Sequence, residues 1–380
     1  MRQYISYKEG MLTGENIDEF CKKHGFDGTE VFMDDIVSRN LPLFNNNKEK
    51  EILKKRLEKL NVKRLHCSYW AYPTSFLTKN DFSQLIERFG DEKEVKAYYG
   101  DLTGRHMFRR WIQEYEMACE LKAQAYTFHL IDYAPIDGEW AFTISREDIC
   151  QAMIFMTQQF ICLLEEREML TESSPQIELE NAGWALEYGV QTSLDYKRLF
   201  NQLYDPHGKV RIGWDINHLL HAIGGEAGKI RFMLPMYELD ANMKRIKAEY
   251  ESCPQKFIME WIKTNLLEPD IIEKIGAIQL SDCALKGTEY FTAGKLNEPF
   301  MGEISKLHTW EEKENYGVGI VLSKYDSHLP LGTGVLSGKE MGKLLEMLKD
   351  QNPELVILHE LKNSSALQSD SDMQLTAIWG

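Results

Sequence analysis

The sequence lacks the features of a membrane-anchored or disulfide-bonded chain. No apolar run approaches the roughly 18 residues that a membrane-spanning helix needs. The first five residues include Arg2 and Gln3 and lack the apolar stretch of a secretory signal. None of the seven cysteines forms a CxxC pair, and an odd count is atypical of a disulfide scaffold. We therefore expect a soluble, cytoplasmic protein whose cysteines are reduced.

The chain also has a deficit of positive charge. Its 44 Lys and Arg residues are outnumbered by 59 Asp and Glu residues, which gives a net charge of −15. Such a chain repels a phosphate backbone, so the composition disfavours nucleic acid as a partner. The hydrophobic fraction of 43% is sufficient for a packed core, and no shift in composition marks a domain boundary. We predict one domain over residues 1–380.

Short apolar strands alternate with longer helical segments along the chain, and no internal repeat is present. The apolar residues of Arg105–Lys122 and Glu147–Glu165 recur at the spacing of amphipathic helices. Most of the predicted strands are bounded by Gly, Pro, Asn or Asp; they are Tyr4–Tyr7, Thr29–Phe32, Arg64–Ser68, Ala125–Leu130, Gln176–Glu180, Val210–Asp215, Ala277–Ser281 and Val356–Glu360.

This strand–helix alternation predicts an α/β fold, a (β/α)8 TIM barrel. A doubly wound open sheet is the alternative, but its first strand is normally followed by a glycine-rich phosphate loop, and Tyr7-Lys8-Glu9-Gly10 is not one. Three connections are longer than plain barrel loops, near residues 70–104, 224–273 and 283–325. All three leave carboxyl ends of strands, where barrel enzymes build their sites, so we expect them to form lids or substrate walls.

Each of the last four predicted strands ends in a side chain that can bind a metal: Glu180, Asp215, Gln279 and Glu360. Alternate residues of a barrel strand point inward, and turning these four inward leaves their apolar neighbours facing the helices. Three carboxylates and one amide oxygen form a hard ligand set that favours Mn²⁺, with Mg²⁺, Co²⁺ or Zn²⁺ as alternatives. Each acid taken alone could equally be the N-cap of the following helix.

Further polar residues lie at the same predicted rim. His66 and His129 end the third and fourth strands, and His218 follows Asp215 by three residues. Each of these histidines could contact substrate or metal, or be an ordinary hydrogen-bonded residue. Asp326 and His328 precede Leu331-Gly332-Thr333-Gly334, whose backbone N–H groups could cradle a phosphate or form a plain tight turn.

The same alternation makes two structural predictions. Glu178 lies one layer deeper than Glu180 and needs a buried partner, for which Arg211 on the next strand is the candidate. His359 points outward, toward the helices, and is expected to be structural.

Taken together, Leu179-Glu180-Asn181-Ala182-Gly183, Asp215-x-x-His218, Gln279-Leu280-Ser281-Asp282, His328-x-x-Leu331-Gly332-x-Gly334 and Glu360 resemble the xylose-isomerase-like TIM-barrel superfamily. That superfamily includes sugar isomerases and epimerases, inosose dehydratase and endonuclease IV. The resemblance implies that Glu180 and Glu360 bind the metal and transfer protons, with Asp215 and Gln279 as the other ligands. It further implies a substrate contact by His218. We also expect substrate contacts by His66, His129, Asp326 and His328, positions that would match zinc ligands in the endonuclease IV branch.

The leading functional hypothesis is a metal-dependent sugar or polyol isomerase or epimerase. One glutamate would remove a proton to give a cis-enediolate and the other would return it. Trp184, with Tyr69 and Trp70, could pack against a sugar ring, or all three could be core aromatics. A dehydratase or lyase would use the same parts. An endonuclease IV-like DNA-repair enzyme is a further alternative, but Gln279 stands where that branch has a histidine, and the net charge of −15 disfavours it. A third alternative is a non-catalytic or regulatory barrel that has kept the scaffold. Separately, the chain could form a homo-oligomer.

Overall fold

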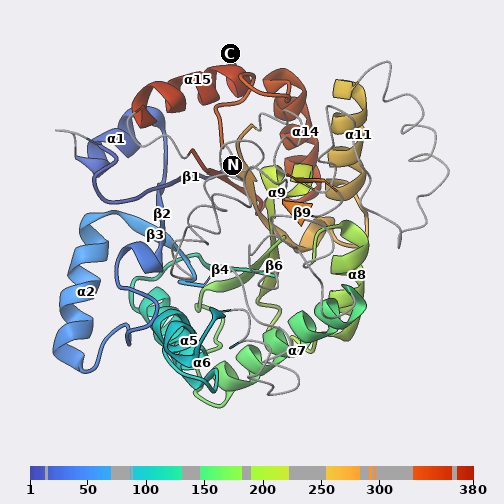
Figure 1. Cartoon of the computed structure of the whole chain (residues 1–380). Coiled ribbons are helices and arrows are strands. Elements are labelled where there is room, and N and C mark those ends of the chain that lie inside the picture. Colours follow the sequence, from blue (N-terminus) through green and yellow to red (C-terminus); the bar gives the residue numbers. More distant parts are fainter. Residues whose placement is uncertain are drawn as a thin grey trace.

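Eight parallel strands close into a barrel in the computed structural model (Figure 1). The structure describes residues 1–12, 16–69, 86, 89–130, 146–181, 190–221, 254–282, 291–292, 295–296, 328–361 and 366–380. Around the barrel the strand order is β1-β10-β7-β6-β5-β4-β3-β2. The predicted TIM barrel is confirmed, because an open doubly wound sheet would have two unpaired edges.

The observed strands agree with the predicted ones to within about two residues at each end. They are β1 (Gln3–Ser6), β2 (Gly28–Phe32), β3 (Val62–His66), β4 (Ala125–His129), β5 (Gln176–Glu180), β6 (Val210–Asp215), β7 (Ile275–Leu280) and β10 (Val356–His359). A separate antiparallel pair, β8 (Phe291–Thr292) and β9 (Lys295–Leu296), lies within the third predicted insertion.

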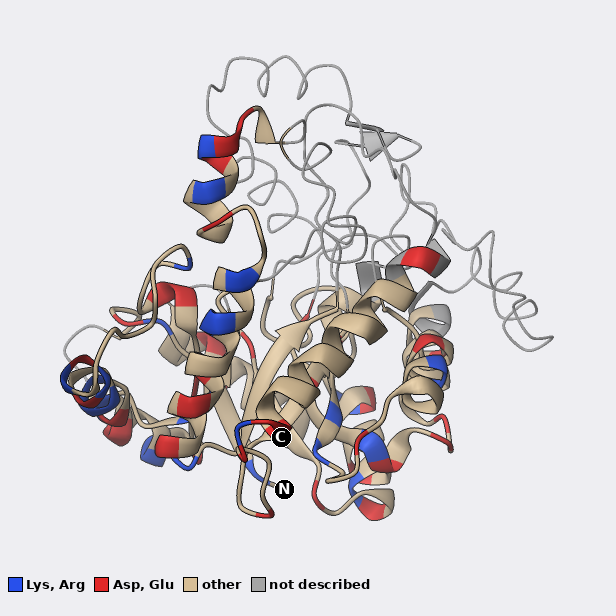
Figure 2. Ribbon diagram, turned by 90° about the horizontal axis from the view of Figure 1, so that it is seen from below, with Lys and Arg blue, Asp and Glu red and all other residues tan. Residues whose placement is uncertain are grey.

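Helices surround the barrel in Figure 1. They are α1 (Ile17–His24), α2 (Asn47–Lys59), α5 (Glu92–Tyr99), α6 (Arg105–Glu120), α7 (Arg146–Glu165), α8 (Ser193–Gln202), α9 (Ile216–His221), α11 (Pro254–Leu266), α14 (Gly338–Gln351) and α15 (Leu367–Trp379), with short 3-10 turns η1 (Met33–Asp35) and η3 (Ile272–Lys274). The two chain termini lie at the same end of the barrel in Figure 2. No helix among the described residues is long and apolar enough to cross a membrane.

Side-chain alternation divides the core into two parts. Outward-facing residues such as Ile177, Trp214 and Ile357 belong to the large apolar cluster that packs the helices against the barrel. A separate small cluster comprises Tyr4, Ala277, Val356 and Leu358, from β1, β7 and β10. Because these residues alternate with the outward set, they line the barrel interior.

Another part of the barrel interior holds a buried ionic cluster. Arg64 on β3 donates through Nε to Glu30 Oε2 at 3.0 Å and through both terminal nitrogens to the carboxylate of Glu178. All three residues are at most 3% exposed. The predicted partner of Glu178 is therefore wrong, since Arg211 lies beside it in register but donates to the carbonyl of Val210. The long side chain of Arg64 reaches from β3 to carboxylates on both β2 and β5. The order of the strands does not predict this contact, because β5 is not adjacent to β3.

His359 points toward the helix layer, as predicted. Its Nε2 lies 2.9 Å from Gln3 Oε1, its Nδ1 lies 3.3 Å from Gln374 Nε2 of α15, and its ring packs against Phe26. Burial lowers the pKa of His359 to about 3, so the ring is neutral at pH 7.

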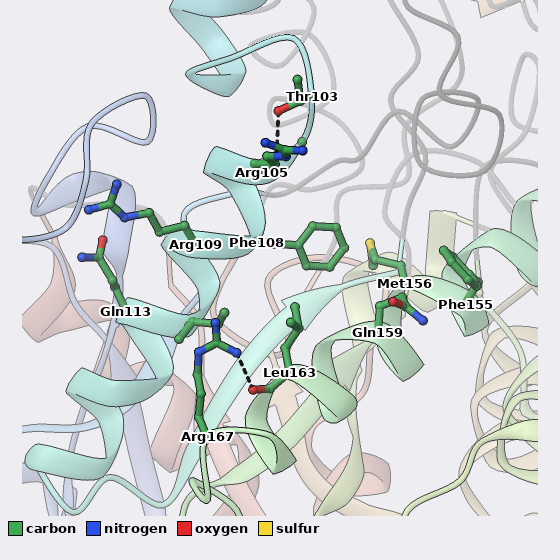
Figure 3. A pocket seen from close by; sticks show the side chains of 12 residues that line it. Thr103, Arg105, Phe108, Arg109, Gln113, Phe155, Met156, Gln159, Leu163 and Arg167 are labelled. Carbon is green, nitrogen blue, oxygen red and sulfur yellow. Dashed lines mark hydrogen bonds between the residues drawn. The ribbon is translucent and has the colours of Figure 1, made fainter.

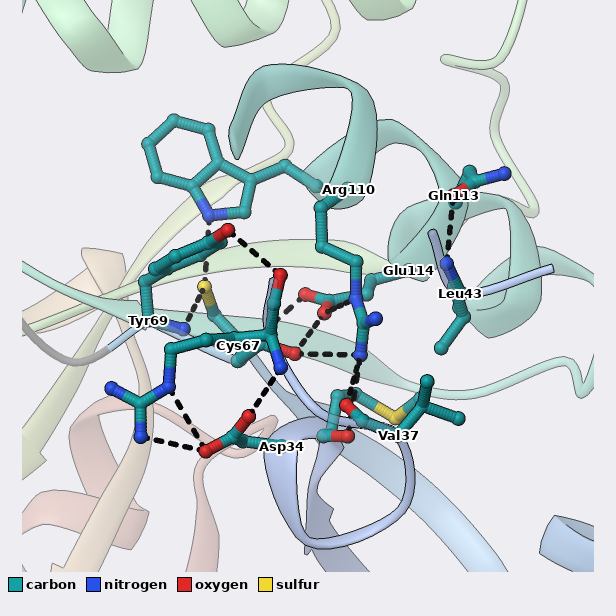
Figure 4. Close-up of polar contacts among 12 residues, drawn as sticks. Asp34, Val37, Leu43, Cys67, Tyr69, Arg110, Gln113 and Glu114 are labelled. Carbon is teal, nitrogen blue, oxygen red and sulfur yellow. Dashed lines mark hydrogen bonds and ion pairs between the residues drawn. The ribbon is translucent and has the colours of Figure 1, made fainter. Parts of the chain in front are cut away.

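The rim after β2 and β3 is fastened to α6 by one buried arginine (Figure 4). Arg110 donates to the carbonyls of Val37 and Leu41, each at 2.7 Å, and to Glu114 Oε1 at 2.7 Å. Glu114 in turn accepts from the Ser68 hydroxyl and from Tyr126 Oη. This network holds the segments that flank His66 without involving His66 itself.

Candidate metal centre at the mouth of the barrel

The predicted site residues lie on adjacent strands at the carboxyl end of the barrel. Glu180 ends β5, Asp215 ends β6, Gln279 lies near the end of β7, and Glu360 directly follows β10. The strands are neighbours in the order β10-β7-β6-β5, and Asp215 is opposite Gln279 in register. Glu180 and Glu360 thus stand on opposite sides of Asp215 and Gln279.

Three histidines surround the carboxylate of Glu180. His66 Nε2 lies 3.0 Å from Oε2, while His129 Nε2 and His218 Nδ1 each lie 3.1 Å from Oε1. The side chain of Glu180 is 1% exposed, so these contacts replace water as its hydrogen-bond donors. The structure therefore brings together four of the predicted side chains.

The charges of this cluster follow from its contacts. Burial alone would raise the pKa of Glu180, but His129, His218 and His66 hold the pKa well below its usual range. Burial would lower the pKa of His66, yet hydrogen bonding and attraction to Glu180 raise it to about 9. Both ring nitrogens of His66 face acceptors, Glu180 and the Cys67 carbonyl, as expected for a protonated ring. For His129, burial prevails and lowers the pKa.

Asn181 fixes the neighbouring part of the site. Its side-chain Oδ1 accepts from the Asp215 N–H at 2.7 Å and its Nδ2 donates to the Asp215 carbonyl at 3.0 Å. Its own carbonyl lies 3.0 Å from His218 Nδ1. The His218 N–H donates to Asp215 Oδ1 at 3.0 Å, which explains the three-residue spacing of Asp215 and His218.

Several buried polar atoms of the site have no hydrogen-bond partner among the described residues. They are Asp215 Oδ2, Gln279 Oε1 and Nε2, and His129 Nδ1. Unpaired buried oxygens are costly, and two of these belong to adjacent strands opposite each other in register. A divalent cation would satisfy Asp215 Oδ2 and Gln279 Oε1 together, so the residues present fit a metal with oxygen ligands.

His328 and Glu360 lie on the side of the site opposite Glu180. His328 Nδ1 lies 3.1 Å from Ser281 Oγ, 3.2 Å from the Glu360 carbonyl and 3.8 Å from Glu360 Oε1. The His328 side chain is fully buried, whereas the Glu360 side chain is 20% exposed. Among the site carboxylates, Glu360 therefore has more access to solvent than Glu180.

The pKa of Asp215 depends on the charged groups around it. Burial raises its pKa to about 6, against the lowering effect of His218 and His328 and with the aid of Glu360 and Glu180. Those long-range effects place the three carboxylates within one electrostatic cluster. Bringing a cation into such a cluster removes the mutual repulsion of the carboxylates.

Ligand atoms gather in two groups. His66, His129 and Glu180 form one, and Asp215, His218 and His328 form the other, each with its ligand atoms within 4.8 Å of one another. The rings of His129 and His218 are 5.4 Å apart and link the two groups. Trp184 and Asp326, predicted as substrate contacts, lie outside the described residues, as does Trp70.

The glycine loop is not an open phosphate cradle. The carboxylate of Asp282 accepts from the N–H groups of Gly332, Gly334, Val335 and Leu336 at 2.8–3.0 Å. The anion that this loop binds is therefore part of the chain itself. The sequence alone assigns no role to Asp282 or Asn181, although an Asp or Asn within two residues of the end of a barrel strand is a signal for contacts at the rim.

A pocket lies on the outside of the barrel. It has a volume of about 500 Å³ between α6 and α7, and its lining includes Arg105, Phe108, Arg109 and Met156 (Figure 3). None of the residues predicted for the site lines it. It is thus separate from the metal centre.

Comparison with known proteins gives distant structural similarity only. No family model and no curated protein matches the chain. Among solved structures, 3-keto-D-glucoside 4-epimerase from E. coli is 12% identical, with a TM-score of 0.49 over 99% of this chain and 98% of that one. Endonuclease IV from Thermus thermophilus is 12% identical, with a TM-score of 0.47 over 100% and 97%. The probable 3-DHS dehydratase from Bacillus anthracis is 11% identical, with a TM-score of 0.48 over 100% of both chains. Such distant similarity does not select a reaction, and the TIM-barrel fold of this chain is shown by its own strand order.

Proposed function

We propose that this chain is a divalent-metal-dependent isomerase or epimerase acting on a sugar or a similar polyol. The observation that supports it most is a pair of buried oxygens, Asp215 Oδ2 and Gln279 Oε1, that accept no hydrogen bond from the described residues and stand on strands between those of the two glutamates. Glu180, Asp215, Gln279 and Glu360 would hold the metal. When bound, a divalent cation polarises a substrate carbonyl and acidifies the adjacent C–H bond.

The two glutamates suit proton transfer on opposite sides of a substrate. They project from β5 and from the end of β10, which are three strands apart in the order of the eight-stranded barrel. Glu360, which is partly exposed, would take the proton from substrate carbon. Glu180 would deliver to the other side a proton that it receives from His66, whose ring lies 3.0 Å away and is protonated at pH 7 because its pKa is raised to about 9. The contact with His129 keeps the Glu180 carboxylate oriented.

The neighbouring histidines would bind substrate oxygens. His129 lies beside Glu180 and its Nδ1 has no partner among the described residues, so it can donate to or accept from a hydroxyl. His218 stands between Glu180 and Asp215 and would contact the same part of the substrate. A dehydratase or lyase would need the same base and the same polarised carbonyl, so product analysis must separate these reactions.

The decisive experiment measures both the metal content of the purified chain and its turnover of candidate substrates. The purified chain should contain one Mn²⁺ or similar ion per chain by elemental analysis and should convert a member of a panel of ketoses, inososes and their phosphates. Glu360→Gln should reduce kcat by about 10²–10⁴-fold while the fold and metal content are retained. Glu354→Gln is the matched control, because Glu354 precedes the same strand and its side chain is 87% exposed. Full activity of Glu360→Gln on the true substrate would exclude the proton-transfer role.

A second candidate is a multinuclear zinc phosphodiesterase of the endonuclease IV type. The two groups of histidine and carboxylate ligands favour it, since they can hold more than one ion. The net charge of −15 disfavours it, as does Gln279, which stands where the endonuclease IV branch has a histidine ligand. Three zinc ions per chain, together with cleavage of DNA at abasic sites, would select this function over the isomerase.

A further inference from the structure

Asp282 occupies an anion-binding loop that lies beside the candidate metal centre. Its Oδ2 accepts from the N–H groups of Gly332 and Gly334 at 2.9 and 2.8 Å, and its Oδ1 accepts from those of Val335 and Leu336 at 2.8 and 3.0 Å. Asp282 is 0% exposed. Converging backbone N–H groups form a concave positive site, and here a carboxylate of the chain fills it.

The same residue is also joined to the loop through its backbone. Asp282 N–H donates to the Leu329 carbonyl at 2.7 Å, and Leu329 N–H donates to the Asp282 carbonyl at 2.9 Å. Loop 328–336 is thus held at its start by two backbone bonds and at its end by four charge-assisted bonds. Without the carboxylate, four N–H groups would lose their acceptor at once.

The first residue of this loop is His328, which belongs to the group with Asp215 and His218. His328 has a φ of +42°, a left-handed conformation that is unfavourable for a residue other than glycine. Such a conformation persists only where the surroundings fix it. Two sets of contacts provide that restraint. Asp282 binds the rest of the loop, and Ser281, the residue before Asp282, has its Oγ 3.1 Å from His328 Nδ1.

From these contacts we propose that Asp282 is a positioning residue, which holds His328 in the metal-binding group by acting as the internal anion of loop 328–336. It touches neither metal nor substrate. The proposal deepens the proposed function, because it concerns the affinity of the same metal centre. It also implies that a small external anion can replace the carboxylate once the side chain is removed.

The test uses Asp282→Ala and measures Mn²⁺ and Zn²⁺ affinity of the metal-depleted full chain by calorimetry. We expect a loss of about 10–100-fold, the usual effect of removing a group that orients a ligand. Sodium formate should restore most of the affinity, while sodium chloride at the same ionic strength should not. Asp205→Ala is the matched control, since Asp205 also accepts from backbone N–H groups, of Lys209 and Val210, but at the opposite end of β6.

A double variant separates positioning from general destabilisation. If Asp282 acts through His328, the affinity of His328→Ala should not fall further when Asp282→Ala is added, and formate should no longer restore it. Additive losses in the double variant would overturn the proposal, as would unchanged affinity of Asp282→Ala.

Hydrogen exchange supplies a readout that does not depend on metal. In Asp282→Ala the amides of 328–336 should exchange faster, and formate should slow them again. Unchanged exchange in this segment would overturn the proposal even if the wild-type chain binds metal. A wild-type chain that binds neither ion would refute the proposed function and the metal-affinity role of His328, whereas the exchange result alone would still decide whether Asp282 holds the loop.

Discussion

Replacing Arg64 by methionine should destabilise the chain by about 3–5 kcal/mol at pH 8, the usual cost of removing one partner from a buried ion pair. Arg64 is 1% exposed and is the cation that contacts both Glu30 and Glu178 inside the barrel. Methionine matches much of the arginine's apolar volume, so the main loss is electrostatic. Two buried carboxylates would then face each other without their counter-ion.

The pH dependence of this loss has a definite sign. Burial raises the pKa of Glu30 to about 7 even though Arg64 lowers it, so removing Arg64 should raise that pKa further. An acid whose folded pKa lies above its unfolded value of 4.5 binds more protons when folded, so stability falls as pH rises through that window. The deficit of Arg64→Met should therefore be smaller at pH 5 than at pH 8.

Urea unfolding followed by tryptophan fluorescence and far-UV circular dichroism at pH 5, 7 and 8 measures both effects. Arg211→Met is the matched control, because Arg211 lies next to Glu178 in register but bonds to the Val210 carbonyl. We expect it to cost less than about 1 kcal/mol. An Arg64→Met variant within 1 kcal/mol of wild type at pH 8, or one whose deficit shrinks as pH rises, would refute the electrostatic reasoning.

Three further predictions concern the metal centre and the barrel wall. Gln279→His should shift metal preference from Mn²⁺ toward Zn²⁺, because imidazole is a better zinc ligand than an amide oxygen; competition calorimetry with both ions measures this, and an unchanged preference would argue against ligation by Gln279. Removing the metal with EDTA should lower Tm, and metal at about 100 times its Kd should restore roughly 2.7 kcal/mol of stability; a Tm that neither treatment changes would contradict metal binding by the folded chain. Because the folded pKa of His359 is about 3 against 6.5 for the free side chain, wild type should lose stability as pH falls below 6.5. His359→Gln should lose about 1.4 kcal/mol less per pH unit there, and parallel acid-unfolding curves for the two proteins would refute this.

Much of the barrel was predictable from local pattern. Strand alternation in Gln176–Glu180 and Val210–Asp215 matched the observed bounds of β5 and β6, and it also gave the outward orientation of His359. The period of two along a strand assigns each side chain to one face regardless of the rest of the fold. The carboxyl ends of parallel strands meet at one rim, so the convergence of Glu180 and Asp215 followed from the barrel itself.

Contacts between side chains that reach past the adjacent strand were not predictable in this way. Arg64, rather than Arg211, pairs with Glu178 because the long arginine side chain extends across the barrel interior. Strand order alone does not show how far a side chain extends. Likewise, the glycines after Leu331 were compatible with a phosphate cradle until the carboxylate of Asp282 was seen to occupy their N–H groups.

The sequence by itself determined the fold class and the faces of the strands, because those depend on spacing between neighbours in the chain. Only the tertiary structure decided that three histidines gather around Glu180, that Asn181 fixes Asp215, and that Asp282 fills the glycine loop. These contacts join residues on different strands or loops, and their pairing depends on side-chain reach and burial within the closed barrel.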